Sequence, residues 1–223
     1  MLDAAPANIE KSLELSVLLS DQFQPSFLQP PELPTRISAS KIVQLISDPD
    51  AFYDQLSRPM PQLFSESAAS GSEFHASLEQ AFLEGSELDF SSWSEEQKEL
   101  GQNFAQSRFS ELKPFAVELP MEFAIAKTVV VCKLDAVFET PEGYLIVDWK
   151  SGKSPSQKAI DDRSIQLALY RIGLARMLEV GVEKISAAFY FAGDNKEVMP
   201  NLASESEIEH VLSELRRAPL PKS

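Results

Sequence analysis

The stretch Thr128–Lys150 reads TVVVCKLDAVFETPEGYLIVDWK, and it decides the fold. Two runs rich in Val, Ile, Phe, Tyr and Trp, Val129–Phe138 and Tyr144–Lys150, flank a Thr-Pro-Glu-Gly turn. β-Branched and aromatic residues favour strands, and a turn of this length predicts a β-hairpin. If the hairpin is symmetric about the Pro141–Glu142 bond, facing residues have numbers that add up to 283.

Two acidic side chains meet in this register, because Asp135 lies opposite Asp148. Directly opposed like charges destabilise a hairpin, and at an effective dielectric of about 20 two unit charges about 5 Å apart repel by about 3 kcal/mol. Lys150 projects from the same face and balances one charge. A divalent cation balances both, and oxygen ligands suit Mg²⁺ or Mn²⁺. The alternative is a solvated hairpin end with a surface ion pair.

Apolar residues flank the two acids on both faces of the predicted hairpin, which argues against a solvated end. Alternation places Val131, Val137 and Ile146 on the face of the aspartates. The other face carries Leu134, Ala136, Phe138, Leu145, Val147 and Trp149. Strands that are apolar on both faces are buried on both. The sequence therefore predicts paired acids inside a covered sheet.

The composition indicates a protein large enough for one well-packed domain, with 223 residues of which 43% are apolar. No run of about 18 apolar residues is present, and the acidic N-terminal stretch is unlike a signal peptide, so we expect a cytoplasmic protein without a membrane span. The single cysteine, Cys132, excludes an internal disulfide and a four-cysteine cluster. The net charge of −14 argues against nonspecific binding of nucleic acid.

The N-terminal part of the chain differs from the rest. A helix is expected over Ile9–Phe23, and four prolines within Gln24–Thr35 predict a semi-rigid connector. We place a domain boundary near Arg36. Residues 1–35 then form an N-terminal helix and connector, and residues 36–223 form the main domain.

The main domain alternates between helical and strand patterns. Helices are expected over 39–47, 50–56, 68–83, 95–108, 160–179 and 205–217, and strands over 115–123 and 184–192 in addition to the hairpin. Ser38, Asp48-Pro49 and a capping box at Ser94–Gln97 mark three helix starts. This order predicts an α/β fold, in which helices flank a mixed central sheet that contains the antiparallel hairpin.

Five motifs in order resemble the PD-(D/E)XK nuclease superfamily, and more narrowly the RecB-type nuclease domains at the C-terminus of bacterial recombination helicases. They are Ile37-Ser38-Ala39-Ser40 with Pro49 and Phe52, Gly71-x-x-x-His75-x-x-Leu78-Glu79, Asp135, Asp148-Trp149-Lys150, and Gln166-Leu167-Ala168-Leu169-Tyr170. The resemblance covers Arg36 to Ala192. It implies a restriction-endonuclease-like fold.

The resemblance also implies a role for each matching position. His75, Asp135 and Asp148 are expected to ligate Mg²⁺ or Mn²⁺, together with the backbone carbonyl of Trp149. Lys150 is expected to orient the attacking water, help to deprotonate it and stabilise charge on the phosphate. A lone histidine on a helix is more often a core or surface residue, and only the resemblance makes His75 a candidate ligand.

Polar residues around this set have two interpretations each. Gln166 and Tyr170 lie one helical turn apart and can face the site together, or they belong to an amphipathic helix whose tyrosine reaches the surface. Lys153 and Arg163 can contact phosphates, or they are solvated charges.

Two acids on the strand before the hairpin are also ambiguous. Glu118 and Glu122 share one face by alternation, and they either extend the acidic site or are exposed charges at a sheet edge. Cys132 stands where members of the family usually have glycine. Members with an iron–sulfur cluster have a cysteine directly before the proline that here follows Asp48, so no such cluster is expected.

The implied function is that of a Mg²⁺- or Mn²⁺-dependent deoxyribonuclease, an exonuclease in DNA recombination and repair. No Gly-x-x-x-x-Gly-Lys-Ser/Thr motif is present, so we expect a helicase domain in cis or a partner helicase-nuclease subunit to deliver single-stranded DNA ends. One alternative is an inactive nuclease-like scaffold that binds a partner helicase subunit. Another is a metal hydrolase that does not act on nucleic acid.

Overall fold

The computed structural model describes residues 33–57, 66–86, 88 and 93–217 of the chain. The helix expected over Ile9–Phe23, and the connector up to Glu32, lie outside the described residues, so the domain boundary near Arg36 stays a prediction. Among the helices that are described, none combines the length and the apolar character needed to cross a membrane.

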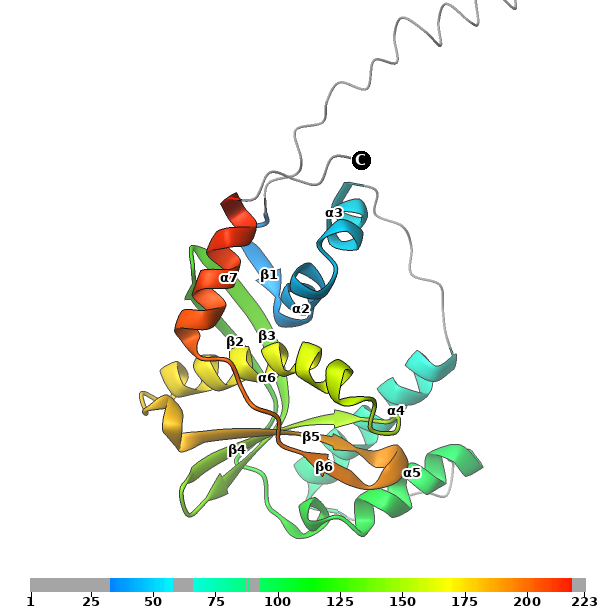
Figure 1. Ribbon diagram of the computed structural model, residues 1–223. Helices are drawn as coiled ribbons and strands as arrows, with labels where there is room; N and C mark the ends of the chain where they lie inside the picture. Colours follow the sequence, from blue (N-terminus) through cyan, green and yellow to red (C-terminus); the bar gives the residue numbers. More distant parts are fainter. Residues whose placement is uncertain (1–32, 58–65, 87, 89–92, 218–223) are drawn as a thin grey trace, which may run out of the picture. The chain divides into compact units, whose positions relative to one another are not determined.

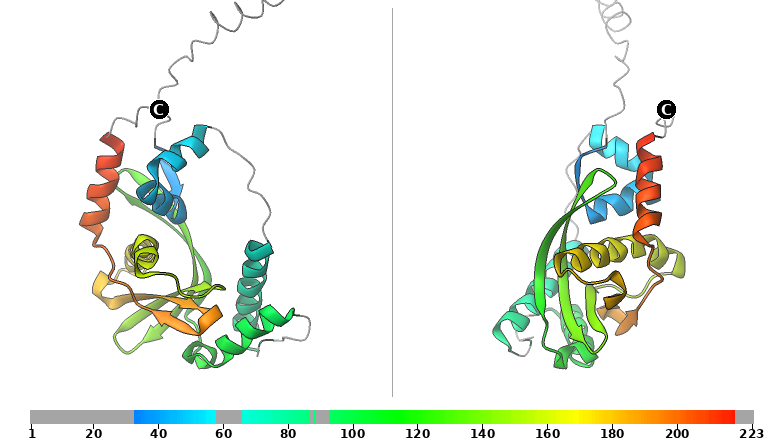
Figure 2. Two further views of the ribbon diagram at one scale, coloured as in Figure 1. Left: turned by 45° about the vertical axis from the view of Figure 1, so that its right-hand side comes forward. Right: turned by 90° about the vertical axis from the view of Figure 1, so that its left-hand side faces the viewer.

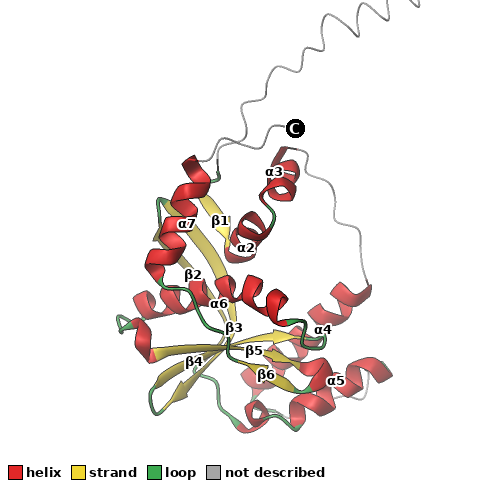
Figure 3. Cartoon of the chain, viewed as in Figure 1, coloured by secondary structure: helices red, strands yellow, loops and turns green. Residues whose placement is uncertain are grey.

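A mixed sheet of six strands forms the centre of the described part. The strands are β1 (Arg36–Ser38), β2 (Ala116–Ile125), β3 (Thr128–Thr140), β4 (Gly143–Lys150), β5 (Ile185–Phe191) and β6 (Lys196–Val198). β3 pairs antiparallel with β2 and β4 and parallel with β1, while β5 pairs parallel with β4 and antiparallel with β6. Figure 3 shows β1 beside the upper part of β3, and β4, β5 and β6 below. β2 pairs with β3 from Thr128 to Val137.

The hairpin of β3 and β4 has the predicted register. Its pairs run from Ala136–Val147 to Thr140–Gly143, and each pair obeys the expected sum of residue numbers. Gly143 has a φ of 147°, and a Cβ there would lie 2.1 Å from the carbonyl oxygen of Lys184. Only glycine fits this turn without strain.

Six helices are described, three of which begin at a predicted cap. They are α2 (Ala39–Ser47), α3 (Pro49–Ser57), α4 (Glu66–Glu84), α5 (Glu95–Ala105), α6 (Gln157–Met177) and α7 (Glu205–Arg217), with 3-10 turns η1 (Arg108–Glu111), η2 (Val182–Lys184) and η3 (Ala192–Asp194). The Ser38 and Asp48 side chains accept backbone N–H groups, and Ser94 forms the predicted capping box. These local predictions are confirmed.

Helices cover both faces of the sheet, as the two apolar faces of the hairpin predict. On one face α2, α6 and α7 pack over a core that includes Val137 and Ile146. On the other, α4, α5 and η1 pack over Phe138, Val147 and Trp149. Figures 1 and 2 show α6 and α7 on one side of the strands and α4 and α5 on the other. The predicted fold class is confirmed.

Three details of the predicted sheet are wrong. β1 and β6 were not expected, because three residues are too few for an alternating pattern. Leu134 was expected on the face of Ala136, but it packs in the cluster of Val137 and Ile146, whereas Ala136 packs in the opposite one. Residues two apart on a regular strand share a face. β3 therefore twists between Leu134 and Ala136, at Asp135.

Candidate active site

The candidate site lies where β3 and β4 separate. Their ladder ends at the Ala136–Val147 pair. From this pair toward Lys150, β4 pairs with β5 alone among the described strands. From the same pair toward Thr128, β3 keeps β2 on one edge, and its other edge pairs with β1 at Val129–Val131. Asp135 and Asp148 are the next residues after that last pair. We call this divergence, with the two aspartates, the fork.

A side chain replaces the ladder at the fork. The backbone N–H of Trp149 donates to Oδ2 of Asp135 at 2.8 Å. A buried backbone N–H needs an acceptor, and a carboxylate supplies one where the neighbouring carbonyl has moved away. The Asp135 carboxylate thus reaches the backbone of β4, and its side chain is only 13% exposed.

His75 approaches the fork from α4. Its Nδ1 lies 3.7 Å from Oδ2 of Asp135. Phe74 and Leu78 are buried in the cluster under α4 and anchor this helix on the sheet. Helical spacing then presents His75 beside them, half-exposed at the edge of the cluster. Residues about 60 positions apart in the sequence meet in this way.

Asp148 is the most deeply buried acid of the set, with 3% of its side chain exposed. Nζ of Lys150 lies 2.5 Å from its Oδ2. On the other oxygen, Gln166 Nε2 donates to Oδ1 at 3.2 Å and lies 2.5 Å from Oη of Tyr170. Gln166 and Tyr170, one turn apart on α6, therefore both face the fork.

Burial and mutual repulsion shift the protonation of the site. Burial, and then the nearby Asp148 carboxylate, raise the pKa of Asp135 to about 7, although the Trp149 N–H and Lys150 oppose this. Burial lowers the pKa of His75, against the attraction of Asp148. A neutral imidazole is the form that ligates metals. Two ionised carboxylates here need a cation to balance them.

A third carboxylate lies beside this pair. His75, Glu118 and Asp135 each offer a ligand atom, and these atoms all lie within 4.8 Å of one another. Glu118, on β2, was one of the two ambiguous acids. The other, Glu122, pairs with Arg36 on β1 instead. Strand alternation predicts the same surroundings for the two glutamates, and the structure places them in different ones.

Residues 36–220 match the family model of the PD-(D/E)XK nuclease superfamily. The chain belongs to this superfamily. Among solved structures, the crystal structure of SSO0001 is similar, with 14% sequence identity and a TM-score of 0.42, covering 95% of this chain and 85% of that chain. No curated protein matches the chain in sequence.

Members of the PD-(D/E)XK superfamily are generally nucleases, and these nucleases use divalent metals. The residues at the fork fit such an ion. Carboxylate oxygens and an imidazole nitrogen converge there, and the buried Oδ2 of Asp148 is paired with the Lys150 ammonium. One ammonium balances one of the two aspartate charges, and a divalent cation would balance the remainder.

The remaining predicted residues differ in their placement. The ring of Trp149 is buried and contacts Phe104, Phe109 and Tyr190 edge-on, which anchors the peptide between Asp148 and Lys150. Lys153 and Arg163 are exposed, and no ion pair between described residues joins either of them to the acids. Their role as phosphate contacts stays a prediction.

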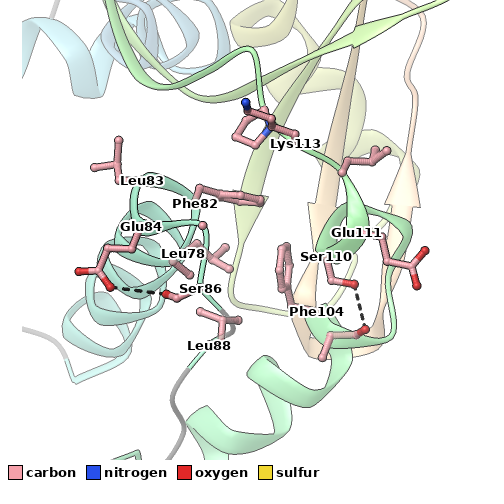
Figure 4. A pocket seen from close by; sticks show the side chains of 15 residues that line it. Leu78, Phe82, Leu83, Glu84, Ser86, Leu88, Phe104, Ser110, Glu111 and Lys113 are labelled. Atoms are coloured by element: carbon pink, nitrogen blue, oxygen red, sulfur yellow. Dashed lines mark hydrogen bonds between the residues drawn. The ribbon is translucent and has the colours of Figure 1, made fainter.

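A cavity of about 790 Å³ lies apart from these groups, between the C-terminal ends of α4 and α5 and the segment after η1 (Figure 4). Its lining includes Leu78, Phe82, Leu83 and Leu112, and it contains none of the fork residues. The candidate catalytic residues therefore do not line this cavity.

Proposed function

We propose that the chain is a divalent-metal-dependent deoxyribonuclease. The observation that carries the proposal is the convergence at the fork of His75, Asp135, Asp148 and Lys150, from α4 and from both strands of the hairpin. Membership of the PD-(D/E)XK superfamily supports it.

The residues divide the work of phosphodiester hydrolysis. A bound divalent ion polarises the phosphoryl oxygen and makes a nucleophile available near neutral pH. His75, Asp135 and Asp148 would hold it, with the Trp149 carbonyl as a further ligand. Lys150, next to Asp148, would orient the attacking water, help to deprotonate it once a bound ion offsets the negative field of the aspartates, and stabilise charge on the phosphate. Gln166 holds Asp148 through Oδ1, and Tyr170 fixes Gln166.

We further propose that the substrate is single-stranded DNA, degraded from its ends in recombination or repair. The net charge of −14 leaves the chain with little positive surface for DNA. A helicase domain in cis or a partner helicase-nuclease subunit would therefore deliver the strand. Lys153 and Arg163 are candidates for contacts to its phosphates.

A digestion assay tests the proposal. The purified chain is incubated with linear single-stranded, linear double-stranded and circular single-stranded DNA, in Mg²⁺, in Mn²⁺ and in EDTA. We expect metal-dependent loss of the linear single strand only. Lys150→Ala should lower the rate by about 10²–10⁴-fold, as expected for a group that transfers a proton. Lys98→Ala is the matched control, because Lys98 pairs with Glu95 on the surface of α5.

Two results contradict the proposal in different ways. Cleavage of the circular strand would show an endonuclease instead of an exonuclease. A folded wild-type chain that leaves every DNA form intact in both metals would support the inactive scaffold that binds a partner helicase subunit.

A further inference from the structure

Glu118 occupies an unusual position on β2. The β2–β3 ladder runs in one register on both sides of it, and in that register it faces Asp135. Its φ of 50° lies in the left-handed region, which residues other than glycine rarely adopt. The twist of β3 at Asp135 and the unusual backbone of Glu118 thus occur at facing positions.

The Glu118 carboxylate is largely buried, and a lysine at the surface balances its charge. Its side chain is 13% exposed. It forms an ion pair with Lys133, whose own side chain is 60% exposed. By contrast Glu122, four residues along the same strand, is 49% exposed and receives two hydrogen bonds from Arg36.

The position of Glu118 matches that of a metal ligand. Its oxygen lies within 4.8 Å of the ligand atoms of His75 and Asp135. Around an octahedral ion with ligands at about 2.1 Å, opposite ligands lie about 4.2 Å apart. Small side-chain rotations therefore suffice to bring the three atoms around one ion. Asp148 is paired with Lys150 as Glu118 is with Lys133, but it is Glu118 whose oxygen lies within 4.8 Å of the ligand atoms of both His75 and Asp135.

We propose that Glu118 is a further ligand of the divalent cation, which extends the set of His75, Asp135 and Asp148 to a third strand of the sheet. The inference rests on the proposed function, because it concerns the ion of that same site. Lys133 competes with the ion for the Glu118 carboxylate, so the two side chains have opposite effects on metal affinity.

Binding of Mn²⁺ to the full chain, followed by the electron paramagnetic resonance signal of free Mn²⁺, tests this without any DNA. Glu118→Gln should weaken binding by at least about tenfold, the lower end of the losses seen when even an outer partner of a metal site is removed. Glu122→Gln, the matched control, should stay within about twofold of wild type. Lys133→Gln should bind Mn²⁺ more tightly than wild type, because no ammonium then competes with the ion for the Glu118 carboxylate.

The possible results distinguish failure of the Glu118 inference from failure of the proposed nuclease function. If Asp135→Asn abolishes Mn²⁺ binding and Glu118→Gln retains it, Glu118 is not a ligand. If Glu118→Gln and Lys133→Gln weaken binding equally, the glutamate acts only through its ion pair, which also overturns the inference. A wild-type chain that binds no Mn²⁺ overturns the proposed function itself. Should Glu118→Gln fail to fold, Mn²⁺ binding by Lys133→Gln decides. Binding tighter than that of wild type supports the inference, and unchanged or weaker binding overturns it.

Discussion

The two halves of the β3–β4 hairpin contrast within a few residues. From Ala136–Val147 to the turn, the strands form a regular ladder with apolar side chains on both faces. One residue farther, at Asp135 and Asp148, the ladder ends and side chains take over the hydrogen bonds. The half toward the turn, the closed half, has a regular ladder and buried apolar side chains, which stabilise a sheet. The other half, the open half, brings together charged side chains, which destabilise one. The closed half therefore stabilises the sheet, and the open half carries the residues that we propose for hydrolysis.

The sharpest test of this contrast changes one residue in each half. Asp148→Asn keeps the shape of the fork but removes one charge of the proposed metal site, so we expect at least about a 10³-fold loss of DNA hydrolysis. Ile146→Val, in the closed half, should retain the wild-type rate and cost about 0.5–1.5 kcal/mol of unfolding free energy. Digestion rates and urea denaturation of both variants measure this. Equal loss of activity in Asp148→Asn and Ile146→Val would show that the open half has no special role in hydrolysis.

Trp149 belongs to both halves, because its backbone is at the fork and its ring is in the apolar cluster. Its side chain is 2% exposed among aromatic rings. We expect Trp149→Ala to cost about 3–5 kcal/mol of unfolding free energy. Trp149→Phe should recover most of it, since a ring remains. Urea denaturation in EDTA measures both, and a loss below about 1 kcal/mol for the alanine variant would show that the cluster does not anchor this peptide.

The fork should also respond to pH when no metal is bound. The pKa of Asp135 is raised from 3.8 to about 7, so between these values the folded chain binds protons that the unfolded chain has lost. The unfolding free energy contributed by Asp135 therefore falls as the pH rises from about 4 to about 7. The lowered pKa of His75 has the opposite sign, because the folded chain then binds fewer protons.

Comparison with Asp135→Asn isolates this effect. Urea denaturation in EDTA across this range should show wild type losing stability with rising pH relative to the variant. A constant difference would mean that Asp135 titrates normally. Since the ion and the proton compete for the carboxylate, Mn²⁺ affinity of the wild type should increase as the pH rises through about 7.

The smallest effect is expected at Tyr170, which lies on α6 and reaches the open half through Gln166. Tyr170→Phe removes the hydroxyl that contacts Gln166 and leaves the buried ring in place. The loss of one hydrogen bond, worth about 0.5–1.5 kcal/mol, should lower the rate of DNA hydrolysis a few-fold with little change in stability. Gln166→Leu, which removes the direct bond to Asp148, should lower it more. The reverse order would show that Tyr170 contacts the substrate itself.

The local sequence determined the turn, the register and three of the helix starts of this protein. The Pro141–Glu142 turn sets which residues face each other, and Ser38, Asp48 and Ser94 cap helices through groups at most three residues away. Such interactions depend on near neighbours, so they can be predicted from the chain alone. The proposed ligand role of His75 and the proposed catalytic role of Lys150 rest on motif resemblance. For His75 nothing local in the sequence connects α4 to the hairpin.

Only the tertiary structure decided where the hairpin opens. Leu134 and Ala136 pack on opposite faces, and Glu118 reaches Asp135 while Glu122 turns to Arg36, although alternation treats each pair as equivalent. Alternation assumes a regular strand with constant partners. Here β3 exchanges β4 for β1 along one edge, and that exchange depends on strands distant in the sequence. The apolar pattern thus determined the sheet. The place where β3 stops pairing with β4 determined where the candidate site residues lie.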